Sequence, residues 1–137
     1  MLVSFQAFGN AGLLGINKPT EFGGLGLPYK YQLAFGEALG HCRAGGVSMA
    51  VAVQADMSTP ALSKFGSDQL RKDFLAPAIA GDMVTCVGVS EPGGGSDVAA
   101  CKTKAVRKGK TKNLKSKATL LVSCMRIEEL KKVVVNR

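Results

Sequence analysis

The chain of 137 residues has no tryptophan, one histidine and no apolar run near the ~20 residues that a membrane-spanning helix needs. The first ten residues lack the basic start and apolar core of a signal peptide and contain no arginine, so we expect no signal or transit peptide. The four cysteines are scattered, without a Cys-x-x-Cys pair: Cys42, Cys86, Cys101 and Cys124. This spacing argues against a zinc or other metal site and against a disulfide framework.

The single histidine, His41, stands beside Cys42. On a helix, consecutive side chains point about 100° apart, so the two do not face each other as a nucleophile and its base would. We prefer the interpretation that His41 lies near a helix C-terminus, where a histidine interacts favourably with the helix dipole.

Positive charge is concentrated in the last quarter of the chain. Residues 1–101 hold six Lys/Arg and eight Asp/Glu, whereas residues 102–137 hold twelve and two. The run from Lys102 to Lys117 would suit nucleic acid or an anionic membrane, but it contains no aromatic residue for base stacking. A solvated basic face is the commoner outcome, so nucleic-acid binding is the least favoured hypothesis.

Residues 1–82 are typical of a helical region interrupted by glycine and proline. We expect a first helix that ends before a loop at 17–19, helices at 28–41, 47–58, 68–75 and 77–80, and a helix restarted by Pro60 and ended by Gly66. Beyond residue 101, alternation at 102–107 and an apolar patch at 118–124 each indicate a strand, and 126–135 suits either a helix or a strand.

The segment 47–58 is apolar over most of its circumference, which predicts burial. On it, Met49 and Met57 are expected to fill the core, Gln54 to be a hydrogen-bonded buried amide and Asp56 to be a solvated carboxylate at a helix end. In the next helix, Leu70 and Phe74 are expected to be buried.

A strand is predicted from Val84 to Val89, since β-branched residues pack well in a sheet. Pro92 ends it, and the three glycines at 93–95 can take positive φ and expose backbone N–H groups to an anion. The cluster has neither the Gly-Lys-Ser/Thr of a Walker loop nor the GxGxxG spacing of a dinucleotide fold. From the residues alone, a phosphate-bearing ligand and a flexible surface loop both remain open, and the loop is the commoner case.

The string at 89–97, VSEPGGGSD, resembles the flavin signature of the acyl-CoA dehydrogenase family. Further segments resemble that family in the same order along the chain: GLLGI at 12–16, PTEFGGLG at 19–26, EALG at 37–40, KFGS at 64–67 and FLAP at 74–77. The resemblance covers roughly residues 5–109, and co-linear motifs are far more specific than any one of them.

The resemblance implies a mainly α fold: a helical N-terminal domain followed by the first strands of a truncated, β-barrel-like middle domain. It implies domains at 1–82, without the family's first helices, and at 83–109, with the flavin signature. Residues 110–137 would be a divergent basic tail.

The resemblance also implies an oxidoreductase of fatty acid metabolism, a flavoprotein that dehydrogenates an acyl-CoA thioester to the 2-enoyl-CoA and passes a hydride to FAD. By motif position, Val87, Val89 and Ser90 would lie along the flavin ring. Gly95 and Ser96 would approach the FAD pyrophosphate, and Ser96 also the pantetheine end of the acyl-CoA substrate. Family members more often carry Thr where Ser90 stands, and some carry an aromatic residue at the position of Val87.

No catalytic residue is assigned, because the family's glutamate base would lie outside this chain, and Glu91, Glu128 and Glu129 match nothing. We therefore expect no turnover by the chain alone. One alternative is a non-catalytic interaction or regulatory module in a homo- or hetero-oligomer with a full-length subunit; the other is a basic-tail nucleic-acid or membrane binder. The resemblance favours a mitochondrial location, and the missing transit peptide otherwise indicates the cytoplasm.

Overall fold

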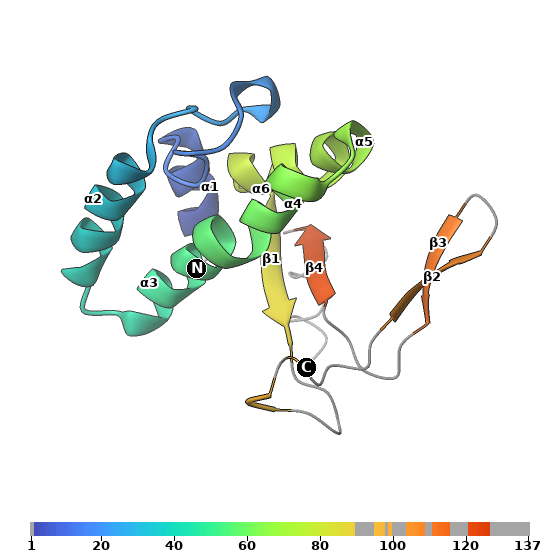
Figure 1. The fold of residues 1–137 in the computed structure, drawn as a ribbon. Helices are drawn as coiled ribbons and strands as arrows, with labels where there is room; N and C mark the ends of the chain where they lie inside the picture. Colours follow the sequence, from blue (N-terminus) through green and yellow to red (C-terminus); the bar gives the residue numbers. More distant parts are fainter. Residues whose placement is uncertain are drawn as a thin grey trace. The chain divides into compact units, whose positions relative to one another are not determined.

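The computed structural model describes residues 2–89, 95–97, 99, 104–108, 111–115 and 121–126, with side chains from residue 5 onward within 5–89, 95–97 and 99 (Figure 1). The chain forms two compact units, residues 1–86 with 124–137, and residues 87–123. The described helices are α1 (Leu2–Asn10), η1 (Thr20–Phe22), α2 (Tyr29–Gly40), α3 (Gly45–Ala52), η2 (Val53–Ser58), α4 (Thr59–Phe65), α5 (Asp68–Leu70), η3 (Arg71–Leu75) and α6 (Ala76–Ala80). The described strands are β1 (Met83–Gly88), β2 (Lys104–Lys108), β3 (Thr111–Lys115) and β4 (Leu121–Arg126). The mainly α fold class is confirmed.

The unit of residues 1–86 with 124–137 contains the described helices and is called the helical unit below. Its described core consists of two apolar clusters. In the first, Phe5, Leu14 and Val51 are buried. Phe8 and Phe35 pack against this cluster and meet edge to face, with ring centroids 6.1 Å apart. The second cluster is formed by Phe22, Leu75 and Ile79.

Backbones approach closely where α1 meets the end of α6. A Cβ on Gly9 would overlap the carbonyl of Ala80, and one on Gly81 would overlap the carbonyl of Phe5. Gly81 also has a φ of 83°, which a side chain would strain. Only glycine therefore suits both positions, and Gly81 ends α6 as the sequence predicts.

The single helix expected at 47–58 is instead an α-helix, α3, followed by a π-helix, η2. The turns of a π-helix are wider than those of an α-helix, and here side-chain hydroxyls donate to their backbone carbonyls. Ser58 Oγ donates to the carbonyl of Val53 at 2.9 Å, and Thr59 Oγ1 donates to that of Gln54 at 2.8 Å. Pro60 follows and has no N–H for the carbonyl five residues back, Ala55 O. That oxygen accepts from the Lys18 ammonium at 2.8 Å and from Thr59 Oγ1 at 3.2 Å.

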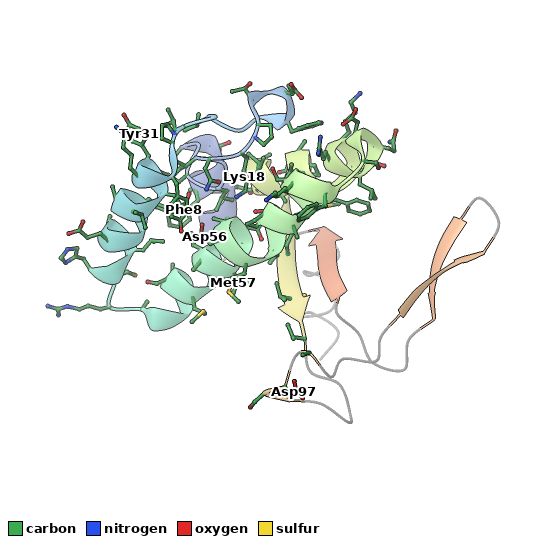
Figure 2. The ribbon with its side chains drawn as sticks, viewed as in Figure 1. Phe8, Lys18, Tyr31, Asp56, Met57 and Asp97 are labelled. Carbon is green, nitrogen blue, oxygen red and sulfur yellow. The ribbon has the colours of Figure 1, made fainter. Side chains whose placement is uncertain are left out.

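Three burial predictions are wrong. Met49 and Met57 were expected in the core, but they are 62% and 56% exposed, and Leu70, also expected to be buried, is 45% exposed. Figure 2 labels Met57. On α3 the buried position is Val51. Because nearly every residue of this segment is apolar, its sequence does not mark which face packs against the core.

The helix expected at 68–75 is also divided, into α5 and the π-helix η3. Its predicted cap is confirmed: Ser67 Oγ accepts a hydrogen bond from the N–H of Leu70 at 3.3 Å. Gly66 ends α4 as predicted, in an extended rather than left-handed conformation.

Strands β2 and β3 pair antiparallel, with Lys104 opposite Lys115 and Lys108 opposite Thr111. Strand β2 confirms the expected strand at 102–107, whereas β3 falls in a charged run for which the sequence predicted no structure. Strand β4 pairs with β1 and overlaps the apolar patch at 118–124. The helix or strand considered at 126–135 lies outside the described residues, apart from Arg126.

Candidate functional site

Strand β1 leads from the helical unit toward the glycine-rich loop, as the sequence predicts. Along it, Met83 and Thr85 are buried, and Cys86 and Gly88 are exposed. Val84 is partly buried against the first apolar cluster. The alternation shows a strand with one face against the helices at its start.

The start of β1 is fixed by one buried amide, that of Gln54. Its Nε2 donates to the carbonyls of Ala78 at 3.0 Å and Met83 at 2.8 Å. Its Oε1 accepts from the N–H and the hydroxyl of Thr85, at 2.7 and 2.8 Å. Ser58 Oγ also bonds the Thr85 hydroxyl. Both donors and both acceptor sites of the amide are used, which confirms the predicted hydrogen-bonded amide.

The predicted cofactor-binding residues lie at and after the end of β1. Val87, within β1, and Val89, just after it, are partly buried, and Gly95 and Ser96 are exposed. Ser90 and the residues from 91 to 94 lie outside the described part of the chain. A Cβ placed on Gly95 would meet no described atom within 4 Å, so a ligand can approach its backbone.

A polar pocket of about 310 Å³ lies elsewhere in the helical unit. Its lining residues, all polar except Pro60, are Asn17, Lys18, Tyr29, Asp56, Pro60 and Ser63. They come from the loop before η1, the first residue of α2, and the junction of η2 with α4. Figure 2 shows Lys18 and Asp56 in this region.

Lys18 is almost fully buried, with 3% of its surface exposed. Its ammonium donates to Asn17 Oδ1 and to the carbonyl of Ala55, each at 2.8 Å. Burial lowers the pKa of Lys18 from its ordinary value of 10.5, and the negative charge of Asp56 offsets part of this lowering.

Asp56 is exposed, as predicted, but it lies within η2 and not at a helix end. Its Oδ2 accepts a hydrogen bond from the buried Gln32 amide at 3.2 Å. The sequence places Lys18 only in a loop and does not predict this pocket. The available signal was Pro60, whose missing N–H leaves a carbonyl that needs another donor.

Among the residues that the structure describes, no group of three or more His, Cys, Asp or Glu side chains is arranged to hold a metal ion. Within the same residues, no helix combines the length and hydropathy needed to cross a bilayer.

Residues 2–82 match the family model of the acyl-CoA dehydrogenase N-terminal domain. The chain is 37% identical over 105 residues to the mitochondrial short-chain specific acyl-CoA dehydrogenase of Rattus norvegicus, covering 76% of this chain and 25% of that protein. It is 36% identical over 107 residues to a probable acyl-CoA dehydrogenase of Bacillus subtilis, covering 77% and 28%. The crystal structure of an acyl-CoA dehydrogenase from Geobacillus kaustophilus matches its fold with a TM-score of 0.70 at 24% identity, over 83% of this chain and 30% of that one.

The chain thus spans about a quarter of the length of the curated relatives that it matches. The matched region holds the helical unit and, from the motif order, reaches the signature string. From the family model and the identity to these relatives, the chain belongs to the acyl-CoA dehydrogenase family.

Proposed function

We propose that this chain forms one wall of a flavin site, in which β1 and the loop after it lie against FAD. The observation that carries the proposal is the attachment of Thr85 to Gln54, which fixes β1 two residues before the first proposed contact, Val87. When bound, FAD accepts the hydride that leaves the acyl chain of the substrate. The signature string at 89–97 supports the choice of a flavin over other phosphate-bearing ligands.

In this proposal each site residue has a separate role. Val87 and Val89 pack against the flavin ring, and Ser90 donates hydrogen bonds to it from its hydroxyl and backbone N–H. Gly95 leaves room for the pyrophosphate, and Ser96 offers a hydroxyl to a phosphate oxygen or to the pantetheine end of the acyl-CoA. The exposure of Gly95 and Ser96 supports these roles, since a bound nucleotide needs access to them.

We further propose that the 137-residue chain does not oxidise acyl-CoA by itself. A base is needed to remove the substrate's α-proton. The described glutamates, Glu21 and Glu37, are both exposed in the helical unit, and neither belongs to the signature string. The base is then supplied by a region of the family that this sequence does not contain.

Flavin titration tests both proposals. Adding FAD to the purified chain is expected to quench flavin fluorescence, with weaker binding in the double variant Ser90→Ala, Ser96→Ala. Thr20→Ala, which removes an exposed hydroxyl far along the sequence, serves as the control. Acyl-CoAs and a dye acceptor are expected to give no bleaching of the flavin. Absence of quenching would overturn the flavin proposal, and substrate-dependent bleaching would overturn the inactivity proposal.

A second candidate function is that of a non-catalytic module that pairs with a full-length family subunit. The observation that favours it is the number of large apolar side chains exposed on the helical unit, among them Leu33, Met49, Met57 and Phe65. Co-purification with a full-length relative, without flavin in the isolated chain, would support this candidate. Salt-sensitive binding to generic DNA would instead favour a role for the basic residues after 101.

We propose a mitochondrial location, which rests on relatives such as that of Rattus norvegicus, whose name includes it. A relative from Bacillus subtilis shows that the family also occurs in bacteria. Imaging of the tagged gene product with a mitochondrial marker checks the location, and a diffuse cytoplasmic signal would contradict it.

A further inference from the structure

The pocket lined by Lys18 and Asp56 has hydrogen-bonding capacity that its own residues do not use. An ammonium has three N–H donors, and two of those of Lys18 are bonded, to Asn17 Oδ1 and to the carbonyl of Ala55. Asp56 accepts from Gln32 through Oδ2, and Oδ1 has no partner among the described residues. One charged donor and one charged acceptor therefore remain at the wall of the same pocket.

The two charges do not satisfy each other directly. They influence each other electrostatically, but no Lys18–Asp56 contact within 4 Å occurs among the described ion pairs. A buried ammonium with an unused donor is costly, so its third N–H needs an acceptor. Because Lys18 lines the pocket, a molecule in the pocket can supply that acceptor.

The volume of the pocket and the charges of its lining residues indicate which class of ligand it can bind. A volume of about 310 Å³ is at the small end of ligand pockets and suits a molecule of few heavy atoms. A simple anion would meet the repulsion of Asp56, and a simple cation that of Lys18. A molecule with both an acidic and a basic group makes two charge-assisted hydrogen bonds.

We propose that this pocket binds a small zwitterion of the amino-acid class, whose carboxylate accepts from the Lys18 ammonium and whose ammonium donates to Asp56. Tyr29 and Ser63 line the same pocket and offer hydroxyls to the rest of the molecule. The site lies entirely in the helical unit and does not depend on the flavin proposal, so either can fail without the other.

A matched series of probes tests the proposal on the full 137-residue chain by amide-resolved NMR titration. Glycine, β-alanine and 4-aminobutyrate carry both charges at different separations, propionate and propylammonium each carry one, and glycerol carries none. The expected result is saturable shifts at residues 17, 18 and 56, with the best zwitterion binding about tenfold more tightly than either singly charged probe, as the loss of one charge-assisted bond requires. Equal affinity for all probes, no saturable shifts, or tightest binding of glycerol would overturn the proposal.

Asp56→Asn removes the negative charge of the pocket and keeps the positive charge of Lys18. The variant carries little risk to folding, because Asp56 is exposed. The variant is expected to bind the preferred zwitterion about tenfold more weakly and propionate more tightly, since the repulsion is removed. Lys18→Met is expected to abolish carboxylate binding. Glu37→Gln, which removes an exposed charge on α2 outside the pocket, should leave all affinities unchanged. Unchanged zwitterion affinity in Asp56→Asn would refute the assigned roles even if Lys18→Met did not fold.

Discussion

Gln54 Oε1 holds Thr85 through both its backbone N–H and its hydroxyl, at 2.7 and 2.8 Å. The same amide donates to the carbonyls of Ala78 and Met83. One side chain from η2 thus joins the end of α6 and the first residues of β1. The strand that precedes the string at 89–97 is attached to the helices through this polar contact and through the packing of Val84.

Replacing Gln54 by leucine should strongly destabilise the helical unit. The substitution removes the buried partner of the N–H of Thr85 and of the carbonyl of Met83, and each unsatisfied group costs about 1–3 kcal/mol. The carbonyl of Ala78 keeps the N–H of Gly81 as a donor. We expect a loss of about 3 kcal/mol or more, measured by urea unfolding followed by circular dichroism. Gln69→Leu, which removes an exposed contact to Asp73, is the control and should change stability little. A loss no larger than in the control would show that the network does not stabilise the fold.

Two glycine-to-alanine substitutions should act in opposite directions. Gly81→Ala places a Cβ against the carbonyl of Phe5 at a φ of 83°, so we expect destabilisation of at least about 2 kcal/mol. Gly36→Ala lies inside α2 with nothing within 4 Å, so we expect stabilisation of about 0.5–1 kcal/mol from helix propensity. Thermal unfolding of both variants measures the difference. A stabilising Gly81→Ala would contradict the close approach of α1 and α6.

The buried ammonium of Lys18 should make stability depend on pH. Burial lowers its pKa below 10.5, so between the lowered pKa and 10.5 the unfolded chain binds a proton that the folded chain does not. The contribution of Lys18 to stability therefore rises with pH in this window and is smallest below it. The stability of the wild type relative to Lys18→Met should increase from neutral pH toward pH 10.5, by about 1.4 kcal/mol for each pH unit between the two pKa values.

The measurement is urea unfolding of the wild type and Lys18→Met at several pH values. Lys30→Met, at an exposed position, controls for the general effect of losing a positive charge. A difference between wild type and Lys18→Met that does not vary with pH would mean that Lys18 is not desolvated in solution.

Exposure of the methionines can be tested against a core position. Met57→Gln should change stability by less than about 0.5 kcal/mol, because the side chain is 56% exposed. Leu75→Ala, at a residue with 0% exposure, should cost about 2–5 kcal/mol. Chemical denaturation of the two variants compares them. A large loss in Met57→Gln would restore the original interpretation of Met57 as a core residue.

Much of the helical unit follows from local chemistry. Ser67, Gly66 and Gly81 mark helix ends by capping, by the extended exit of the chain and by positive φ, and each acts where the sequence predicts it. The buried amide of Gln54 was also predicted, because a polar residue within an apolar helix must find partners. These features depend on a few neighbouring residues, so they can be inferred without knowing the tertiary fold.

The errors have a common physical origin, which is tertiary contact. The exposure of Met49 and Met57 depends on which sides of α3 and η2 pack against the rest of the unit. A uniformly apolar sequence does not indicate those sides. The π-turns depend on hydroxyls and on a lysine that is 37 residues away from its acceptor, Ala55. For the flavin site, Val87, Val89, Gly95 and Ser96 remain predictions from the motif, and Ser90 lies outside the described residues.

The π-helix η2 widens the helix between α3 and α4 by one residue per turn. A π-turn holds one residue more than an α-turn, so deleting one residue between Val53 and Ser58 would let an ordinary helix form. The helix beyond the deletion would keep roughly its present direction, because the deleted residue is the extra one that the wide turn accommodates. The carbonyls of Val53 and Gln54, which accept from the hydroxyls of Ser58 and Thr59, would then accept from backbone N–H groups four residues further on. A deletion of a single codon here would thus replace hydroxyl contacts by backbone ones while leaving the helix intact.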